Sequence, residues 1–188
     1  MQTNHRFEVR VFLGIGSGLH GFLNDVPNDL ARAGLQFVDL GLRQLHAATP
    51  LIQSAVRRYG KLDIVVCNAG VDIKKKAIDF TASEFDYVIH GNLRSHFLTA
   101  QAAARQFLKQ GTGGVIVMNS SNASVAAFEE LTPYCAAKGG IDMLVRGLAA
   151  EWGPQGIRVN AFNPGYTIHA MTPDGIEQLK RESADIIA

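Results

Sequence analysis

The stretch that decides the fold is Val115–Gly153, VIVMNSSNASVAAFEELTPYCAAKGGIDMLVRGLAAEWG. It begins with Val115–Met118, an all-apolar run that follows Gly113 and Gly114 and precedes a polar cluster, a pattern typical of a buried parallel strand. Ligands in open α/β sheets bind at the carboxyl ends of the strands, so hydroxyl groups placed there are candidates for a site. The polar residues at this end are Ser120, Ser121, Asn122 and Ser124.

A long helix is predicted after this cluster, over residues 133–152. Thr132 can cap it, Pro133 suits its first position, and Gly153 ends it. Tyr134 and Lys138 lie one turn apart, so a phenol and an ammonium group share one face of the helix. A neighbouring cation favours phenolate and lowers a phenol pKa that starts at about 10. This pair can therefore perform acid–base chemistry at neutral pH.

The composition indicates a single globular domain over residues 1–188, long enough to bury a core. The chain is 47% hydrophobic and carries a formal net charge of +1, which provides no basic field for nucleic acid or anionic lipid. No apolar run approaches the roughly 18 residues of a membrane span, and Glu8 and Arg10 interrupt the core that a signal peptide requires. We expect a cytoplasmic protein with neither nucleic-acid nor membrane partners. Cys67 and Cys135 lack metal-ligand spacing, so we expect reduced thiols and no metal site.

Strands and helices alternate along the chain. A capping box at Thr81–Glu84 opens a helix that runs to about Lys109, and Gly91-Asn92 predicts a kink within it. The alternation predicts an α/β fold with a Rossmann-like, doubly wound parallel sheet in three α/β/α layers. The strands are expected at 9–13, 35–40, 62–67, 115–118 and 157–162, and the helices at about 43–59, 84–109 and 133–152.

A glycine-rich segment, GIGSGLHG, occupies residues 14–21 after the first expected strand. Its spacing fits the dinucleotide fingerprint, in which glycines let backbone amides approach a pyrophosphate at a helix N-terminus. An ordinary flexible loop explains it equally well, because Pro27 stands where the long helix should begin. The candidate cofactor-binding residues of this loop are Gly14, Gly16 and Gly18.

Asp39 ends the second expected strand, close to the spacing after the glycines at which an acidic residue binds an adenosine ribose. It can equally belong to the strand immediately before the Asn68-Ala69-Gly70 turn, because only one expected helix separates the two. A third interpretation is a strand-end aspartate that caps the next turn. The residues leave the three open.

Taken together, these motifs resemble the short-chain dehydrogenase/reductase family. The resemblance covers about residues 29–175, whereas residues 1–28 are atypical. The residues that carry it are Asn68-Ala69-Gly70, Asn92, Ser121, Tyr134 with Lys138, and Pro164-Gly165.

The resemblance implies an NAD(P)-dependent oxidoreductase that transfers a hydride between nicotinamide and a secondary alcohol or ketone. Tyr134 would be the general acid/base, and Lys138 would lower the pKa of Tyr134 and hold the nicotinamide ribose. Ser121 would hold the substrate oxygen, and Asn92 would anchor a water that relays protons to Lys138. The segments EFDYVIHGNL and LAAEWGPQGIRVNAFNPGYT are most similar to members that act on sugar acids and polyols.

The same resemblance implies a cofactor site. Asn68, Ala69 and Gly70 would line the adenosine side, and Pro164, Gly165 and Thr167 would contact the nicotinamide end. The choice between NAD and NADP stays open, because one βα unit is missing between the glycine loop and Asn68. The family's last helix and strand are also missing. The resemblance further implies a homo-oligomer formed through the helices at 84–109 and 133–152.

Two other functions compete with this one. The chain could be a catalytically inactive remnant or a cofactor-binding interaction subunit that keeps the fold without turnover. A serine hydrolase is disfavoured, because Ser121 lacks the G-x-S-x-G pattern and has no evident histidine partner.

Overall fold

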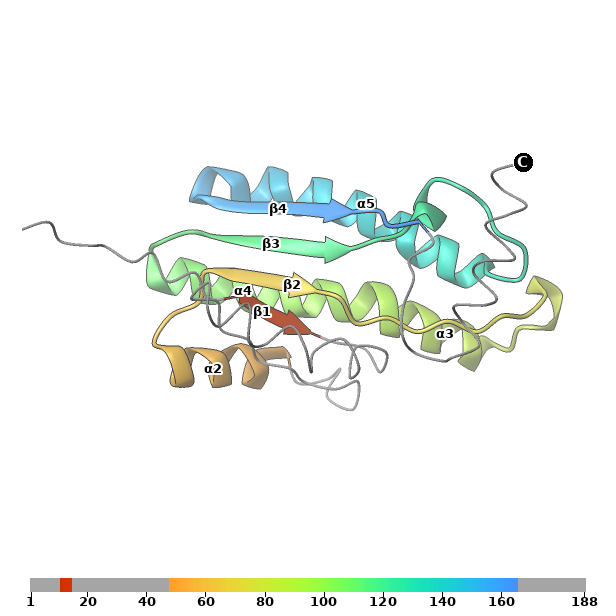
Figure 1. Ribbon diagram of the computed structural model, residues 1–188, viewed down its shortest axis with the longest axis horizontal. Coiled ribbons are helices and arrows are strands. Elements are labelled where there is room, and N and C mark those ends of the chain that lie inside the picture. The colour runs from red at the N-terminus through yellow and green to blue at the C-terminus, as the bar shows by residue number, and fades with distance from the viewer. Residues whose placement is uncertain (1–10, 15–47, 166–188) are drawn as a thin grey trace, which may run out of the picture.

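The computed structural model describes residues 11–14 and 48–165, and there four strands form one parallel sheet (Figure 1). The sheet has the order β1-β2-β3-β4, and each strand pairs in parallel with the next. The carboxyl ends of all four strands therefore meet at one edge of the sheet. The strands are β1 (Val11–Gly14), β2 (Ile64–Cys67), β3 (Gly114–Asn119) and β4 (Ile157–Phe162), which confirms the parallel α/β sheet expected from the sequence.

Helices cover one face of this sheet. The helix α4 (Ser95–Gln110) packs against β2 and β3, α5 (Thr132–Trp152) packs against β4, and α2 (Ala48–Tyr59) packs against α4. Figure 1 shows α4 and α5 lying behind the strands. Right-handed crossovers that step along a sheet in one direction place their helices on the same face, so the chain-order sheet explains this single layer. None of the helices within 48–165 is long and apolar enough to cross a membrane.

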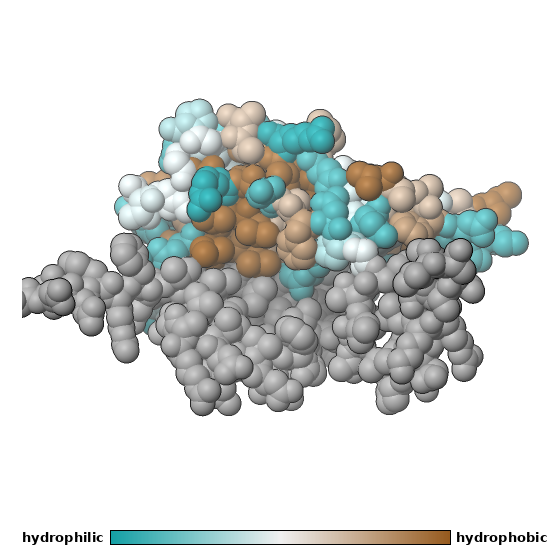
Figure 2. All heavy atoms as spheres, turned by 45° about the horizontal axis from the view of Figure 1, so that its top comes forward, coloured by the Kyte–Doolittle hydropathy of each residue, from teal (hydrophilic) through white to brown (hydrophobic). Residues whose placement is uncertain are grey.

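The opposite face of the sheet is also apolar. Residues of β2 and β3 alternate between full burial on the helical side and partial burial on the other, where Ile64, Val66, Val115 and Val117 lie. Figure 2 shows hydrophobic side chains gathered on this face. A strand that is apolar on both sides is typical of a parallel sheet covered on both faces, which agrees with the three-layer arrangement predicted from the sequence.

The long helix predicted from Thr81 is interrupted, as the sequence indicated. The capping box is present, with the backbone N–H of Glu84 donating to Thr81 Oγ1 at 3.3 Å and that of Thr81 donating to Glu84 Oε2 at 2.8 Å. It opens α3 (Ala82–Ile89), which passes through a π-helical turn (His90–Arg94) into α4. The predicted kink at Gly91-Asn92 is this π-turn.

The start of α5 corrects one expectation. Thr132 does not cap the helix, because the backbone N–H of Cys135 already donates to the carbonyl of Leu131 at 2.9 Å and places Thr132 inside the first turn. Leu131 is the N-cap residue and makes no side-chain capping bond. The helix ends at Gly153 as predicted.

The core lies between the sheet and the helical layer. At the centre of this layer Phe107 of α4 packs so closely on Gly114 that a Cβ added there would overlap its ring. A glycine at the start of β3 therefore lets the two elements approach. The core includes Ile52, Leu62, Val65, Ala103, Phe107, Ile116, Met118, Ile141 and Ile157.

Several predictions fall outside the described residues. These are the strand at 35–40, the first part of the helix at 43–59 and the site candidates Gly16, Gly18, Asp39 and Thr167.

Candidate active site

The site lies at the edge of the sheet where the strands end. Asn68–Gly70 follow β2, Ser120–Ser124 follow β3, and Asn163–Gly165 follow β4. Side chains and backbone connect the three segments: Asn119 Nδ2 donates to Asn68 Oδ1 at 2.5 Å, and the backbone N–H of Asn122 donates to the carbonyl of Pro164 at 2.8 Å. The structure therefore brings together the turns that the sequence placed at strand ends.

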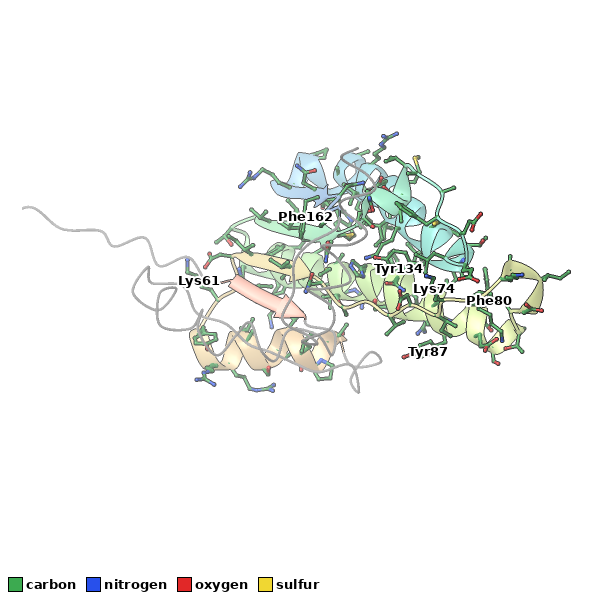
Figure 3. All side chains as sticks on the ribbon, turned by 45° about the vertical axis from the view of Figure 1, so that its right-hand side comes forward. Lys61, Lys74, Phe80, Tyr87, Tyr134 and Phe162 are labelled. Atoms are coloured by element: carbon green, nitrogen blue, oxygen red, sulfur yellow. The ribbon has the colours of Figure 1, made fainter. Side chains whose placement is uncertain are left out.

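Tyr134, Lys138 and Ser121 converge at this edge. The first turns of α5 carry Tyr134 and Lys138, and Figure 3 shows Tyr134 beyond the carboxyl ends of the strands. Lys138 Nζ lies 5.4 Å from the centroid of the Tyr134 ring. The Ser121 hydroxyl donates to Asn122 Oδ1 at 3.2 Å and lies close enough to Tyr134 to affect the pKa of its phenol. A phenol, an ammonium group and a hydroxyl thus form one cluster.

Lys138 is the buried cation of the cluster, with 2% of its surface exposed. Its Nζ donates to the carbonyl of Asn119, the last residue of β3, at 2.7 Å. Burial disfavours the ammonium form and lowers the pKa of Lys138 to about 8. The group is still mostly an ammonium at neutral pH.

The pKa of Tyr134 differs from the sequence-based expectation. Burial of the phenol raises its pKa above the ordinary value, the neighbouring hydroxyl of Ser121 lowers it less, and the nearby carboxylate of Asp72 raises it further. The expectation of a lowered pKa is therefore wrong for this structure, because burial of the phenol outweighs the groups that favour the phenolate. The phenol keeps its proton at neutral pH, as a general acid must.

Asn92 lies in the π-turn and is fully buried. A π-turn breaks the regular helical hydrogen bonds, and Asn92 Nδ2 compensates by donating to the carbonyl of Val88 at 2.8 Å. The same amide bonds to both backbone groups of Val71, donating to its carbonyl at 2.6 Å and accepting from its N–H at 3.3 Å. The side chain thus fixes the segment after β2. Its predicted role in holding a water stays a prediction.

Gly70 lies between Asn92 and Lys138. A Cβ at this position would be 2.9 Å from Asn92 Oδ1 and 4.0 Å from Lys138 Nζ. Only a glycine leaves the Asn92 side chain in place, so the Asn68-Ala69-Gly70 turn has a bare backbone next to the cluster.

The described residues fit the binding of a dinucleotide. The turns at Asn68–Gly70 and Pro164-Gly165 flank the Tyr134 cluster, and Gly14 ends β1 beside Cys67. Asn119 Oδ1 is buried at the end of β3 and has no hydrogen-bond partner in the described part of the chain. These turns and this free acceptor are suited to NAD or NADP. In contrast, residues 48–165 contain no group of three His, Cys, Asp or Glu side chains that could hold a metal ion.

Sequence reasoning missed His96, which is 1% exposed and one turn beyond Asn92. Its Nδ1 lies 3.3 Å from Ser95 Oγ, and its Nε2 is buried without a hydrogen-bond partner of good geometry in the described structure. Burial lowers the pKa of His96 to about 3, and the charge of Lys138 acts in the same direction. The sequence signal that could have identified it is its position four residues after Asn92, which places both polar side chains on the same face of the helix.

Comparisons with known proteins agree with this geometry. The model of the short chain dehydrogenase family matches residues 17–180. The chain is 39% identical over 137 residues to the 2-dehydro-3-deoxy-D-gluconate 5-dehydrogenase of Dickeya dadantii (strain 3937), which covers 73% of this chain and 52% of that protein. It is 35% identical over 159 residues to the protein of the same name in Escherichia coli (strain K12), covering 82% of this chain and 61% of that one.

A solved structure gives the same result for the fold. A short-chain type dehydrogenase/reductase from Mycobacterium marinum has a TM-score of 0.77 and 26% sequence identity, covering 94% of this chain and 78% of that chain. This similarity confirms the Rossmann-like fold predicted from the sequence. The alignments span only 52% and 61% of the length of the two curated relatives above.

Proposed function

Because the chain belongs to the short-chain dehydrogenase family, we propose that it is an NAD(P)-dependent oxidoreductase acting on a secondary alcohol or ketone. The observation that supports this most is the convergence of Ser121, Tyr134 and Lys138 at the carboxyl edge of the sheet. These are the residue types that proton transfer to a carbonyl oxygen requires. The competing prediction of a non-catalytic remnant gains no support from a cluster whose acid, cation and hydroxyl are all in contact range.

In the reduction direction, the reaction needs a hydride at the carbonyl carbon and a proton at its oxygen. NAD(P)H, when bound, supplies the hydride. Ser121 donates a hydrogen bond to the substrate oxygen, and the protonated phenol of Tyr134 gives that oxygen its proton. Lys138 then stabilises the phenolate that remains, because its ammonium lies over the same ring. Oxidation of an alcohol runs through the same groups in reverse.

Residues around the cluster would hold the cofactor. Asn68, Ala69 and Gly70 would line its adenosine side, and Pro164 and Gly165 its nicotinamide end. Lys138 would exchange its bond with the Asn119 carbonyl for one with the ribose, which fixes the ring against the substrate. We propose no preference between NAD and NADP, and a cytoplasmic location stays a prediction.

The proposed substrate class is a sugar acid or a polyol. Both named relatives above are dehydrogenases of 2-dehydro-3-deoxy-D-gluconate, a keto sugar acid by its name. The two alignments cover 73% and 82% of this chain, so we extend this substrate class to it as a proposal.

The experiment starts with cofactor binding by the whole chain. We expect saturable quenching of NADH or NADPH fluorescence, and then oxidation or reduction of a member of a panel of keto sugar acids and polyols. The Tyr134→Phe variant is the matched control, because it should bind the cofactor equally well and turn over nothing. Failure to bind either cofactor would overturn the proposal, and binding without turnover on any panel member would favour the non-catalytic alternative.

We also propose a homo-oligomer that buries α4 and α5. A groove of about 960 Å³ runs between these helices. Met143 on its rim is 61% exposed and Phe97 is 36% exposed, which is costly for a surface left in water. A second copy would cover it. Analytical ultracentrifugation should find a dimer or larger assembly that Met143→Glu dissociates, and a monomeric wild-type chain at micromolar concentration would contradict the proposal.

A further inference from the structure

A hydrogen-bonded clamp that the proposed function does not use connects three elements at the site. Its centre is the amide of Asn163, directly after β4. Asn163 Nδ2 lies 3.0 and 3.3 Å from the two carboxylate oxygens of Asp142 on α5, 2.6 Å from Ser124 Oγ and 3.2 Å from the carbonyl of Ser121. An amide nitrogen has two protons, so four acceptors within reach leave it little freedom of orientation.

Asp142 provides the charge of this clamp. Burial alone would raise the pKa of its carboxyl, but the polar side chains of Ser124 and Asn163 and the charge of Arg146 outweigh burial and hold the pKa below its usual value. The carboxylate accepts from Asn163 after β4, and the same amide contacts Ser121 and Ser124 after β3. Hydrogen bonds to a charged acceptor are the stronger kind, so Asp142 is the strongest element of the clamp.

The clamp lies one turn beyond Lys138 on the same helix. Ser120 Oγ donates to the carbonyl of Lys138 at 3.1 Å, which connects the loop of Ser121 to that helix directly. Backbone hydrogen bonds also connect the two loops. The N–H of Ser120 donates to the carbonyl of Phe162 at 2.9 Å, and the N–H of Asn122 donates to the carbonyl of Pro164 at 2.8 Å. The backbone thus keeps the loops adjacent, and the clamp fixes their side chains.

We propose, on the basis of the function proposed above, that Asp142 is a positioning residue that acts through Asn163. Its carboxylate orients the amide of Asn163, and that amide holds the loop that carries Ser121 against the loop that carries Pro164 and Gly165. The Ser121 hydroxyl, which would bind the substrate oxygen, then stays at a fixed distance from the Pro164-Gly165 turn, which would contact the nicotinamide. Loss of the clamp leaves both loops in place but lets this separation vary.

The first test is the kinetics of Asp142→Ala with the best substrate of the panel. Small misplacements of reacting groups cost up to about a hundredfold, so we expect kcat to fall roughly ten- to hundredfold while the Kd for NAD(P)H changes little. The primary deuterium isotope effect with deuterated cofactor should rise, because hydride transfer becomes slower than product release. Asp142→Asn, which keeps one acceptor oxygen, should recover part of the loss. Asp86→Ala is the matched control, because it removes an exposed carboxylate from α3.

A double-mutant cycle tests whether Asp142 acts through Asn163. Asn163→Ala should reduce kcat to a similar extent. The kcat of the double variant should be no lower than that of the less active single variant. Additive losses, or losses with an unchanged isotope effect, would overturn the proposal.

Hydrogen exchange separates this proposal from the proposed function. If the wild-type chain turns over no substrate, the proposed function fails, and the clamp is judged by amide protection of residues 120–124 alone. We expect faster exchange in Asp142→Ala, or in Asp142→Asn should the alanine variant not fold. Unchanged protection in the folded variant would overturn the clamp itself.

Discussion

The helices α4 and α5 belong to one layer but deliver side chains to the site in different ways. The helix α5 starts at the site, so Tyr134 and Lys138 reach it from the first turns of an uninterrupted helix. In contrast, α3 and α4 lie on either side of the site, and the π-turn between them carries Asn92. Regular backbone bonding in α5 leaves its polar side chains available for chemistry. In the π-turn, Asn92 instead bonds to the carbonyl of Val88, and Ser95 directly after it bonds to the carbonyl of Gly91.

Substitutions at the start of α5 and substitutions in the π-turn should therefore have different consequences. Changes at the start of α5 should remove activity and preserve the fold, whereas changes in the π-turn should first reduce stability.

The largest expected effect is that of Tyr134→Phe on turnover. Removing a general acid costs roughly 10²- to 10⁴-fold, so kcat should fall within that range. Melting temperature should stay near the wild-type value, because the ring keeps its packing and loses only its hydroxyl group. Parallel kinetics and thermal melts check this. A variant that melts much earlier would break the contrast between the two helices.

Lys138→Met should reduce activity without reducing the stability of the fold at pH 7. Because the folded pKa of about 8 lies below the ordinary 10.5, the unfolded chain binds more protons between these values. Burying the ammonium thus destabilises the fold below pH 8, and this cost disappears as pH rises through 10.5. The variant should therefore lose activity but melt no earlier than wild type at pH 7. Its stability should also depend less on pH between 8 and 10, as chemical unfolding would measure.

Asn92→Ala should show the opposite behaviour to Tyr134→Phe. The variant leaves the backbone groups of Val71 and the carbonyl of Val88 without their side-chain partner. Each buried group left unsatisfied costs about 1–3 kcal/mol, so urea unfolding should detect a clear loss of stability. Ser83→Ala, in an exposed part of α3, is a suitable control. Wild-type stability in Asn92→Ala would show that the π-turn does not depend on this amide.

The smallest effect is expected at His96, and it appears only in acid. Its folded pKa of about 3 lies below the ordinary 6.5, so the unfolded chain binds the extra proton between these values. Wild-type stability should therefore decrease as pH falls from 6.5 toward 3. His96→Leu should reduce that decrease, measured as the free energy of unfolding from pH 7 to pH 4. An identical pH dependence in both proteins would contradict the buried neutral ring.

Local patterns made much of this molecule predictable. The capping box at Thr81, the strand at Ile157–Phe162 and the pairing of Tyr134 with Lys138 depend on neighbours within a few residues, which the sequence displays directly. Thr132 was misplaced as a cap because Leu131, which has no capping side chain, starts the helix one residue earlier.

Features that depend on distant segments could not be predicted. The bonds between Asn92 and Val71 exist only when the helix packs against the loop after β2. The raised pKa of Tyr134 reflects burial that no spacing rule contains. The clamp of Asp142 and Asn163 likewise joins residues that are brought together only by the crossover from β3 to β4.

The π-turn has a consequence for how the chain folds. A free peptide with this sequence would favour regular α-helical bonding, because the amide of Asn92 would have no Val71 to bind. The wider turn can therefore close only after β2 and its loop have docked on the helix. Tyr134 and Lys138 need no such event within their own helix. We therefore expect pulse-labelling during refolding to protect α5 early and the His90–Arg94 turn late. The last step in forming the site would then be the placement of Asn92, after Tyr134 and Lys138 are already in position.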